Sequence, residues 1–498
     1  MKKYILIILC CLTSFPLWSY NVNMIVEHYS VDQGLPNNTV NCTLKDRDGF
    51  IWFGTWYGLC CFDGVKFKTF NKQEHDSDVP PRKIQRIVED KNGYIWVKTI
   101  DRKLYVFNKV TECFHAVYDD MKNYSENIQV IKLQNTAEGD VLLLTKDKNL
   151  LLAGVDEKGQ VTIKILFDSR NEINKHDYTL KHHVLCETEE YISWIGTDYK
   201  VAAVHKGSEL ASRPADFITS KINSGDKDSF TSFFEDGRKV WVGDRAGIFY
   251  SIDVRTGLVS RYVLSEIIGA ISNLLVTPAG YVYLSVAGQG TYEYDLAERR
   301  LQKINTEMND AMVTHAFIDQ YDKIWFHENE KALIYYDPLN HTAKRFPFTM
   351  FGKITTLYSE DAGERGLFFL SPAGEAWLFD REHAEMVYIK KLKQLSNDRA
   401  NQQFYHLMLD NDGVLWLSSA DEGVYCMNFP KKQFNLLSLS PQSVGQENYA
   451  TGVRALFQSK SGDIWVGTRW QSVYRMDRNG VTKHVFSTGD EHIGNVYH

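Results

Sequence analysis

The sequence has few prolines and few runs of basic residues. Only 11 of its 498 residues are Pro, so it contains no proline-rich linker. The formal net charge is −7, and Lys and Arg gather only in short runs such as KKLK at 390–393. A nucleic-acid-binding protein usually carries a basic patch or stripe, so this charge balance predicts no nucleic acid partner.

Sequence motifs of the common catalytic sites are also missing. The chain has no GxSxG, HExxH or P-loop pattern, and none of its eight cysteines forms a CxxC pair. We therefore predict no catalytic residue, no metal site and no cofactor. Two cysteines lie in the N-terminal segment, and the other six are interpreted as mostly buried free thiols, with disulfide bonding left open: Cys42, Cys60, Cys61, Cys113, Cys186 and Cys426.

Long apolar runs are absent after the N-terminus. Two lysines precede an apolar run from Tyr4 to Leu12, and the small residue Ser19 follows. This order is typical of a secretory signal peptide, which we expect to occupy residues 1–20. The run is shorter than the roughly 20 residues that span a bilayer. The chain left after cleavage is expected to be exported and to have no membrane segment.

What the sequence does contain is aromatic residues, at 13%, which favours β structure. The stretch DGFIWFGTWYGL at 48–59 recurs in weaker form, and ten copies can be aligned on one aromatic or apolar position. From residue 52 to residue 465 the nine intervals average about 46 residues, the period of a four-stranded propeller blade. The aligned positions are Trp52, Trp96, Leu142, Trp194, Trp241, Tyr283, Trp325, Phe369, Trp416 and Trp465.

Each copy predicts a blade of four short antiparallel strands. The D-x-x-G pattern, as at Asp46–Gly49, predicts a tight hairpin turn because Asp bonds nearby backbone and Gly adopts positive φ. Such a blade exposes apolar faces and is stable only when neighbours cover it. The fold class is therefore all-β, a β-propeller of four-stranded antiparallel blades.

The number of copies exceeds the four to eight blades of a typical ring. We therefore expect a first seven-bladed propeller over 21–345 and an incomplete second propeller over 346–498, with the start of an eleventh repeat at the end. The irregular junction at 428–453 gives an alternative boundary near 430–450. In that case the two N-terminal blades, or at least the first strand, would pack with the second ring.

Two kinds of aromatic residue have to be distinguished. The recurring tryptophans predict packing between blades: Trp52, Trp96, Trp194, Trp241, Trp325, Trp416 and Trp465. The pairs Trp56–Tyr57 and Arg469–Trp470 follow a Gly-Thr step in two copies only. Aromatic rings stack on sugar faces and Arg pairs with carboxylate or sulfate, so these four residues are the candidate ligand site. The alternative is that they are surface residues of the turns without a binding role, or that they pack one ring against the other.

The opening of the chain, HYSVDQGLPNNTVNCTLKDRDGFIWFGTWYGLCCFDG at 28–64, resembles the two-component regulator propeller repeats. Residues 453–477 resemble them equally well. The resemblance implies the periplasmic sensor of a hybrid two-component system, with two seven-bladed propellers. In such proteins an immunoglobulin-like domain, a membrane helix, a histidine kinase, a receiver and a DNA-binding domain follow.

The sequence departs from that pattern because it ends within the second propeller and carries no kinase motif. We therefore expect a fragment of a sensor, non-enzymatic itself, that recognises an oligosaccharide from glycan breakdown in the periplasm. A homodimer would form through the missing C-terminal regions. One alternative is a propeller glycoside hydrolase or polysaccharide lyase, and a second is a non-binding interaction scaffold or pseudogene product.

Overall fold

The computed structural model describes residues 24–498, apart from 71–80, 123, 125–128, 170–179, 197–200, 208–214, 217–229, 305–312, 329–330, 352–357, 362–365, 372–373, 393–403, 429–452, 469–472, 478–481 and 487–498. The expected signal peptide lies outside the described residues. The chain divides into two compact units, Met1–Phe429 and Pro430–His498.

The described strands form ten four-stranded antiparallel sheets, which confirms the predicted fold class. One sheet belongs to the second unit, which leaves nine blades in the first. Blades 1 to 3 are β2 (Val40–Lys45), β3 (Ile51–Thr55), β4 (Gly58–Phe62), β5 (Phe67–Phe70); β6 (Ile84–Glu89), β7 (Ile95–Thr99), β8 (Leu104–Asn108), β9 (Cys113–Ala116); and β10 (Val130–Asn135), β11 (Val141–Thr145), β12 (Leu150–Val155), β13 (Val161–Phe167).

Blades 4 to 6 are β14 (Leu180–Glu187), β15 (Tyr191–Gly196), β16 (Val201–His205), β17 (Ala215–Asp216); β18 (Phe230–Glu235), β19 (Lys239–Asp244), β20 (Phe249–Asp253), β21 (Leu258–Tyr262); and β22 (Ile271–Val276), β23 (Tyr281–Val286), β24 (Gly290–Asp295), β25 (Arg300–Lys303). Blades 7 and 8 are β26 (Val313–Ile318), β27 (Ile324–Glu328), β28 (Ala332–Asp337), β29 (Thr342–Pro347); and β30 (Tyr358–Asp361), β31 (Leu367–Leu370), β32 (Glu375–Asp380), β33 (Glu385–Lys391).

Blade 9 is β34 (Phe404–Leu409), β35 (Val414–Ser419), β36 (Val424–Asn428) and, as its outer strand, the first strand of the chain, β1 (Ile25–Tyr29). The described helices are short: η1 (Val31–Gln33), α1 (Tyr118–Met121) and η2 (Phe348–Phe351). Among the described residues, no helix has the length and apolarity needed to cross a membrane.

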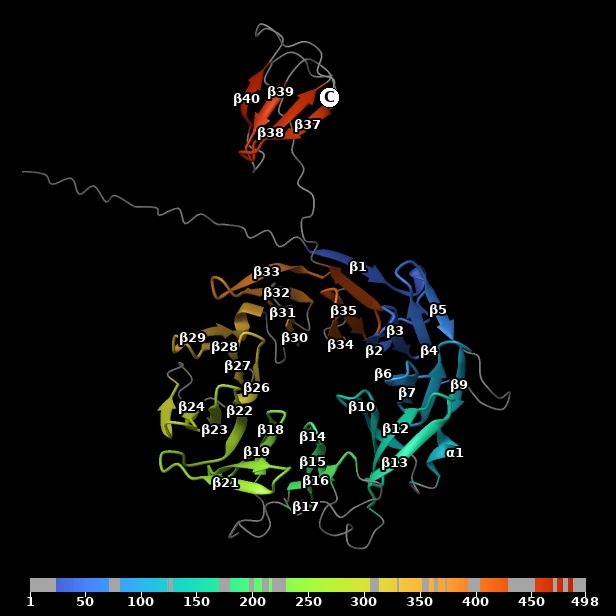
Figure 1. The fold of residues 1–498 in the computed structure, drawn as a ribbon, viewed down its shortest axis with the longest axis vertical. Helices are drawn as coiled ribbons and strands as arrows, with labels where there is room; N and C mark the ends of the chain where they lie inside the picture. Colours follow the sequence, from blue (N-terminus) through green and yellow to red (C-terminus); the bar gives the residue numbers. More distant parts are fainter. Residues whose placement is uncertain are drawn as a thin grey trace, which may run out of the picture. The chain divides into compact units, whose positions relative to one another are not determined.

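The nine blades of the first unit follow one another around a ring (Figure 1). Each neighbouring pair shares a cluster of buried apolar side chains, including the pair formed by blade 9 and blade 1. In the cluster between blades 1 and 2, for example, Trp52 packs with Ile84 and Phe107. Burying such a side chain contributes on the order of 2–3 kcal/mol, so each blade is stabilised by its two neighbours.

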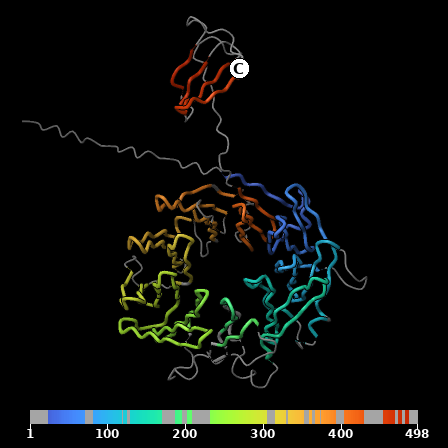
Figure 2. Tube along the Cα trace, viewed as in Figure 1, coloured from blue at the N-terminus to red at the C-terminus, as the bar shows by residue number. Residues whose placement is uncertain are grey.

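The ring is closed by pairing between its two ends. Strand β1 runs antiparallel to β36, with Val26 opposite Met427, and His28 stacks on Tyr425 at 4.5 Å between ring centroids. Tyr29 then contacts Phe62 of blade 1 at 5.0 Å. The trace in Figure 2 shows the first strand beside the last blade of the ring. The N-terminal strand thus covers an edge that blade 9 would otherwise leave unpaired.

The two units meet after Phe429 and not near residue 345, where the boundary was expected. Arg345 lies within strand β29 of blade 7. Phe346 of blade 7 packs in one cluster with Phe369 of blade 8, so the apolar core is continuous across that point. The first unit contains nine blades where seven were expected. Its end at Phe429 lies beside the alternative boundary near 430–450. The first strand pairs with the ninth repeat, inside this same unit.

The second unit contains one described sheet of four strands: β37 (Val453–Gln458), β38 (Ile464–Thr468), β39 (Val473–Met476) and β40 (Thr482–Phe486). Its apolar cluster is built on Val466, Tyr474 and Met476. Leu456 and Phe457 are 70% and 65% exposed, whereas Ile87 and Val88, at the corresponding positions of blade 2, are buried. Within the described part of the second unit, no other blade covers this sheet as neighbouring blades do in the ring.

Candidate functional site

The D-x-x-G turn and the repeated tryptophan form one hydrogen-bonded unit. In blade 1, Oδ1 of Asp46 accepts the backbone N–H groups of Asp48 and Phe50, and its Oδ2 accepts the Trp52 indole N–H at 2.7 Å. The same indole-to-carboxylate bond occurs in four further blades: Trp96–Asp90, Trp241–Asp236, Trp325–Asp319 and Trp416–Asp410. One carboxylate, buried in each of these blades except blade 5, therefore holds both the turn and the ring that packs on the next blade.

In two blades that lack the tryptophan, the turn also lacks the aspartate. Blade 3 has Leu142 in place of Trp and Thr136 in place of Asp, and blade 6 has Tyr283 with Thr277. A buried carboxylate without a donor is costly, so the acid is not kept when the indole is lost. All the ring tryptophans named above are buried, as is Trp194 of blade 4. Trp465, in the described blade of the second unit, is half-buried, and its turn has Ser459 in place of Asp.

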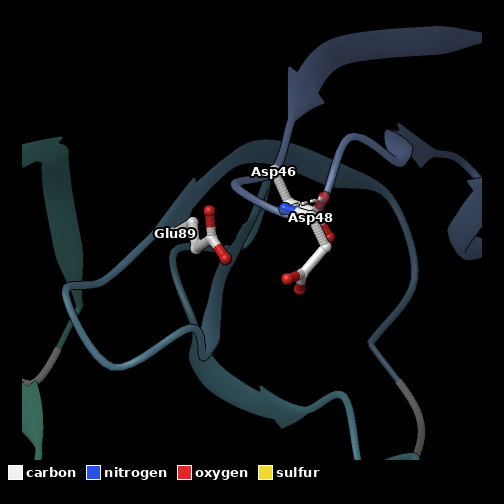
Figure 3. Close-up of side chains that lie close together, drawn as sticks. All are labelled: Asp46, Asp48 and Glu89. Atoms are coloured by element: carbon white, nitrogen blue, oxygen red, sulfur yellow. Dashed lines mark hydrogen bonds between the residues drawn. The ribbon is translucent and has the colours of Figure 1, made fainter.

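Three carboxylates converge between blades 1 and 2: Asp46 and Asp48 from one turn and Glu89 from the end of β6 (Figure 3). The ammonium group of Lys109 lies among them, 3.1 Å from Asp46, 2.6 Å from Asp48 and 2.8 Å from Glu89. Burial alone would lower the pKa of Lys109, but these hydrogen bonds raise it above its usual value. The hydrogen bond from Lys109 lowers the pKa of Asp48. The acidic cluster therefore already holds its cation.

Similar ion pairs join other blades. Lys206, which follows β16, pairs with Glu138 in the turn of blade 3 and with Glu187 at the end of β14. Arg381, which follows β32, pairs with Asp319 of blade 7 and Asp361 of blade 8. A cation after the third strand of one blade thus binds the turn of the preceding blade. Recurrence around the ring indicates that this arrangement connects blades.

A cleft of about 820 Å³ opens beside this cluster, between blades 1 and 2. Its lining includes Phe50, Trp52, Phe70 and Tyr94, and it also contains Lys68, which pairs with Glu112 at 2.5 Å. The lining residues carry charges of both signs, and the pair Lys68–Glu112 joins the two blades that form the cleft. The cleft lies at the N-terminal end of β3, next to the D-x-x-G turn that precedes this strand.

The predicted pair Trp56–Tyr57 lies at the other end of β3, in the turn before β4, and therefore on the opposite face of the ring. Trp56 is 42% exposed and Tyr57 is 61% exposed. The Tyr57 N–H donates to the Thr55 hydroxyl, and the Trp56 N–H donates to the carbonyl of Thr39. The turn is thus held firmly while both rings face solvent.

A cation accompanies the exposed indole. The Lys83 ammonium lies 5.3 Å from the centre of the Trp56 ring. The Lys83 N–H also donates to the Trp56 carbonyl at 3.0 Å. Lys83, in the first residues of blade 2, was missed by sequence reasoning because no repeat pattern brings it next to Trp56. An indole face with an adjacent ammonium can stack on a sugar and pair with a polar substituent.

The structure does not bring the two predicted pairs together, since Arg469 and Trp470 lie outside the described residues. Of the six cysteines after the N-terminal segment, five are free thiols: Cys42, Cys60, Cys61, Cys113 and Cys426. The side chain of Cys186 lies outside the described part of the structure. Burial raises the pKa of Cys42, Cys60 and Cys426 to about 12 in each case, so these thiols are unreactive at neutral pH.

Comparison with known proteins identifies one of the repeats. Residues 34–57 match the family described as "Two component regulator propeller", which confirms the predicted resemblance at that repeat. No curated protein matches the chain.

Solved structures resemble the chain only distantly. The extracellular domain of a putative hybrid two component system from B. thetaiotaomicron shares 17% identity at a TM-score of 0.33, covering 95% of this chain and 61% of that one. The Dos1 propeller shares 12% identity at a TM-score of 0.43, covering 81% and 93%. PorZ, from the type-IX secretion system of Porphyromonas gingivalis, shares 11% at a TM-score of 0.29, covering 92% and 70%. The chain thus spans about three fifths of the length of the first of these.

Proposed function

We propose that this chain is the exported, ligand-sensing region of a two-component signalling system and that it is non-enzymatic. The observation that carries the proposal is the family match at residues 34–57, together with the nine further copies of that repeat. In this proposal the ring works in the periplasm and passes a change of conformation to a kinase, which lies outside this sequence.

The proposed ligand is an oligosaccharide, and its proposed site is the face of the ring that carries Trp56 and Tyr57. The support is physical. Exposing an indole at 42% and a phenol at 61% on a turn that is itself well fixed gives a preorganised stacking surface. Lys83 adds a charged donor at the edge of that surface. Oligosaccharides present both apolar ring faces and hydroxyl groups, which this combination can bind.

The test is thermal unfolding of the purified protein with a panel of oligosaccharides from plant and host glycans. At least one of them should raise the melting temperature, because a ligand that binds only the folded state stabilises it. Trp56→Ala should reduce the affinity for that oligosaccharide about tenfold, the loss expected when one stacking ring is removed.

Phe50→Ala is the matched control, because Phe50 is also 42% exposed but lies in the D-x-x-G turn at the other end of β3. It should leave the affinity unchanged. If Phe50→Ala abolishes binding and Trp56→Ala does not, the site is the cleft on the opposite face. If no oligosaccharide alters the melting temperature, the sensing proposal is wrong for this ligand class.

A further inference from the structure

Blade 2 contains a buried lysine that the repeat does not explain. Lys98 on β7 is only 6% exposed. The corresponding position is glycine in blades 1 and 5 and in the second unit, and it is Leu144, Ser285, His327 and Ser418 in blades 3, 6, 7 and 9. Buried side chains are therefore accepted at this position, and those of Leu144, Ser285 and Ser418 carry no charge. Among these blades, blade 2 alone has a lysine or arginine here.

The ammonium of Lys98 has only neutral partners among the described residues. It donates to the Gln85 side-chain oxygen at 2.8 Å and to the Ile131 carbonyl of blade 3 at 2.6 Å. A buried charge is normally stabilised by an opposite charge, and burying a charge without such a partner is unfavourable. The fold alone therefore gives no reason for a charged residue here.

Lys98 has another cation opposite it. Arg86 on β6 is its direct cross-strand partner, an arrangement that is unfavourable for two cations. Burial, and then the charges of Arg102 and Arg86, lower the pKa of Lys98 to about 8. The charge of Arg86 also acts on His406 of blade 9, second to burial. Arg86 pairs with Lys98 across the two strands, and Arg102 lies in the turn that follows β7; these three residues are named here the basic cluster.

Arg102 is itself a basic residue at an unfavourable position, because its backbone conformation suits glycine. Arg102 has φ 68°, a left-handed conformation, and Lys148 in the equivalent turn of blade 3 has φ 70°. In blade 1 the turn contains Gly58 at φ 124°. A residue other than Gly in this conformation costs about 1 kcal/mol. Blades 2 and 3 therefore have a basic side chain at a place where glycine would be more stable.

We infer that the basic cluster binds an anionic group of the ligand, either a sulfate or a carboxylate. An oxyanion would supply the missing opposite charge to all three cations, with the charge-assisted hydrogen bonds that Arg and Lys donate to such groups. The unfavourable burial of the Lys98 charge and its repulsion with Arg86 are then offset only when the anion is bound. This is the pattern expected of a binding site kept at a cost in stability.

The cluster is next to the proposed sugar site. The Ile100 N–H, two residues after Lys98, donates to the Lys83 carbonyl at 2.9 Å, and the Lys83 N–H donates to the Trp56 carbonyl. The turns of blades 1 and 2 are thus joined through Lys83. Resting on the proposed function, the inference deepens it: the oligosaccharide is acidic, with a sugar ring on Trp56 and its anionic substituent on the basic cluster.

The first test uses inorganic sulfate as the probe. Thermal unfolding of the full protein is followed from 0 to 20 mM sodium sulfate, with sodium chloride at equal ionic strength as reference. The wild type should show a saturable rise in melting temperature that chloride does not reproduce. Arg86→Gln should lose this rise, whereas Lys66→Gln, an equal loss of charge in the turn between β4 and β5, should keep it. An equal response of the wild type and Arg86→Gln would overturn the inference.

A second variant separates binding from a structural role. Lys98→Met should lose the sulfate response and should unfold at the same or a higher temperature without ligand, since it removes a buried charge opposite Arg86. If Lys98 only ties blade 2 to Ile131, Lys98→Met would instead lower the melting temperature and retain the sulfate response. That second result would overturn the role given to Lys98.

The last arm uses neutral, uronate-containing and sulfated oligosaccharides of equal length in calorimetric titrations. Preference for uronate or for sulfated sugars identifies the anion, and Arg86→Gln should weaken that binding at least tenfold. Binding of neutral sugars alone, unchanged in Arg86→Gln, would overturn the inference and leave oligosaccharide sensing intact. Binding of sulfate without any oligosaccharide would support the anion site and count against oligosaccharide sensing.

Discussion

At the scale of single residues, ionic groups in this protein connect blades. Lys109 shows this most directly, because its ammonium contacts Asp46, Asp48 and Glu89 in the interface between blades 1 and 2. Removing one partner of a buried pair leaves the other charges uncompensated, which costs more than the pair contributes when intact.

We predict that Lys109→Ala lowers the free energy of unfolding by about 3 kcal/mol. The same substitution should make the acidic cluster available to Ca²⁺, so that 5 mM CaCl₂ raises the melting temperature of Lys109→Ala and not that of the wild type. Urea titrations and thermal scans with and without calcium measure both effects. Lys68→Ala, which removes an exposed pair with Glu112, should cost less than about 1 kcal/mol. A calcium response of the wild type would show that the cluster is a metal site.

A second residue-scale prediction concerns pH. Burial, and secondly the charge of Arg86, lower the pKa of His406 to about 4, below its ordinary value of 6.5. His406 is therefore neutral in the folded state above about pH 4, whereas the unfolded chain binds a proton at this residue below about pH 6.5. Its contribution to stability is complete above about pH 6.5. That contribution is lost as the pH falls from about 6.5 to 4.

Urea unfolding at a series of pH values measures how much free energy of unfolding is lost between pH 6.5 and 4. This loss should be smaller for His406→Phe than for the wild type, by on the order of 1–3 kcal/mol. His383→Gln is the control, because His383 is exposed and pairs with Asp380 at the surface. A pH profile of His406→Phe parallel to that of the wild type would contradict the prediction.

At the scale of elements, the first strand decides whether the ring is closed. Strand β1 is the only one of the blade 9 strands that comes from the start of the chain, and it places Glu27 directly opposite the free thiol of Cys426. Directly paired residues of an antiparallel sheet lie at a separation that a disulfide can bridge.

Glu27→Cys should therefore form a disulfide between position 27 and Cys426 under mild oxidation, detectable by peptide mass spectrometry. The crosslink ties together strands about 400 residues apart, so the oxidised form should be more stable than the reduced form by about 2–4 kcal/mol. Glu27→Ser controls for loss of the carboxylate. Failure of the disulfide to form under denaturant-free oxidation would argue that β1 does not pair with β36.

At the scale of the whole molecule, the two units differ in how their blades are covered. Blades in the first unit bury apolar residues against neighbours on both sides, whereas the described blade of the second unit leaves Leu456 and Phe457 exposed. Because blades of this kind depend on nearest-neighbour packing, their stabilities should differ as well.

Hydrogen exchange measured by mass spectrometry tests this. Amides of β38 should exchange at least tenfold faster than those of β3 and β7, and amides of β39 at least tenfold faster than those of β4 and β8, the corresponding strands of blades 1 and 2. The reason is that local opening of an uncovered sheet costs less free energy. The comparison is internal to one sample. Equal protection of the two sets would show that the second unit is covered on both faces in solution.

Much of the fold follows from local sequence. The Asp46–Gly49 turn, the alternation of short strands and the buried Trp52 are dictated by residues a few positions apart, and the repeat of about 46 residues marks every blade. The Asp–Trp hydrogen bond explains why both residues recur and why Thr136 accompanies Leu142. The exposure of Trp56 and Tyr57 agrees with their absence from the other repeats.

What the sequence by itself determined is thus the blade, its turn and the identity of the residues that do not repeat. The tertiary structure decided how many blades share a ring, because closure depends on β1 pairing with β36 across the whole unit. It also decided which charged residues meet: Lys109 with the turn of the preceding blade, and Lys98 with Arg86. Interactions within a blade are local in sequence and can be read from it, whereas those between blades depend on the curvature of the ring.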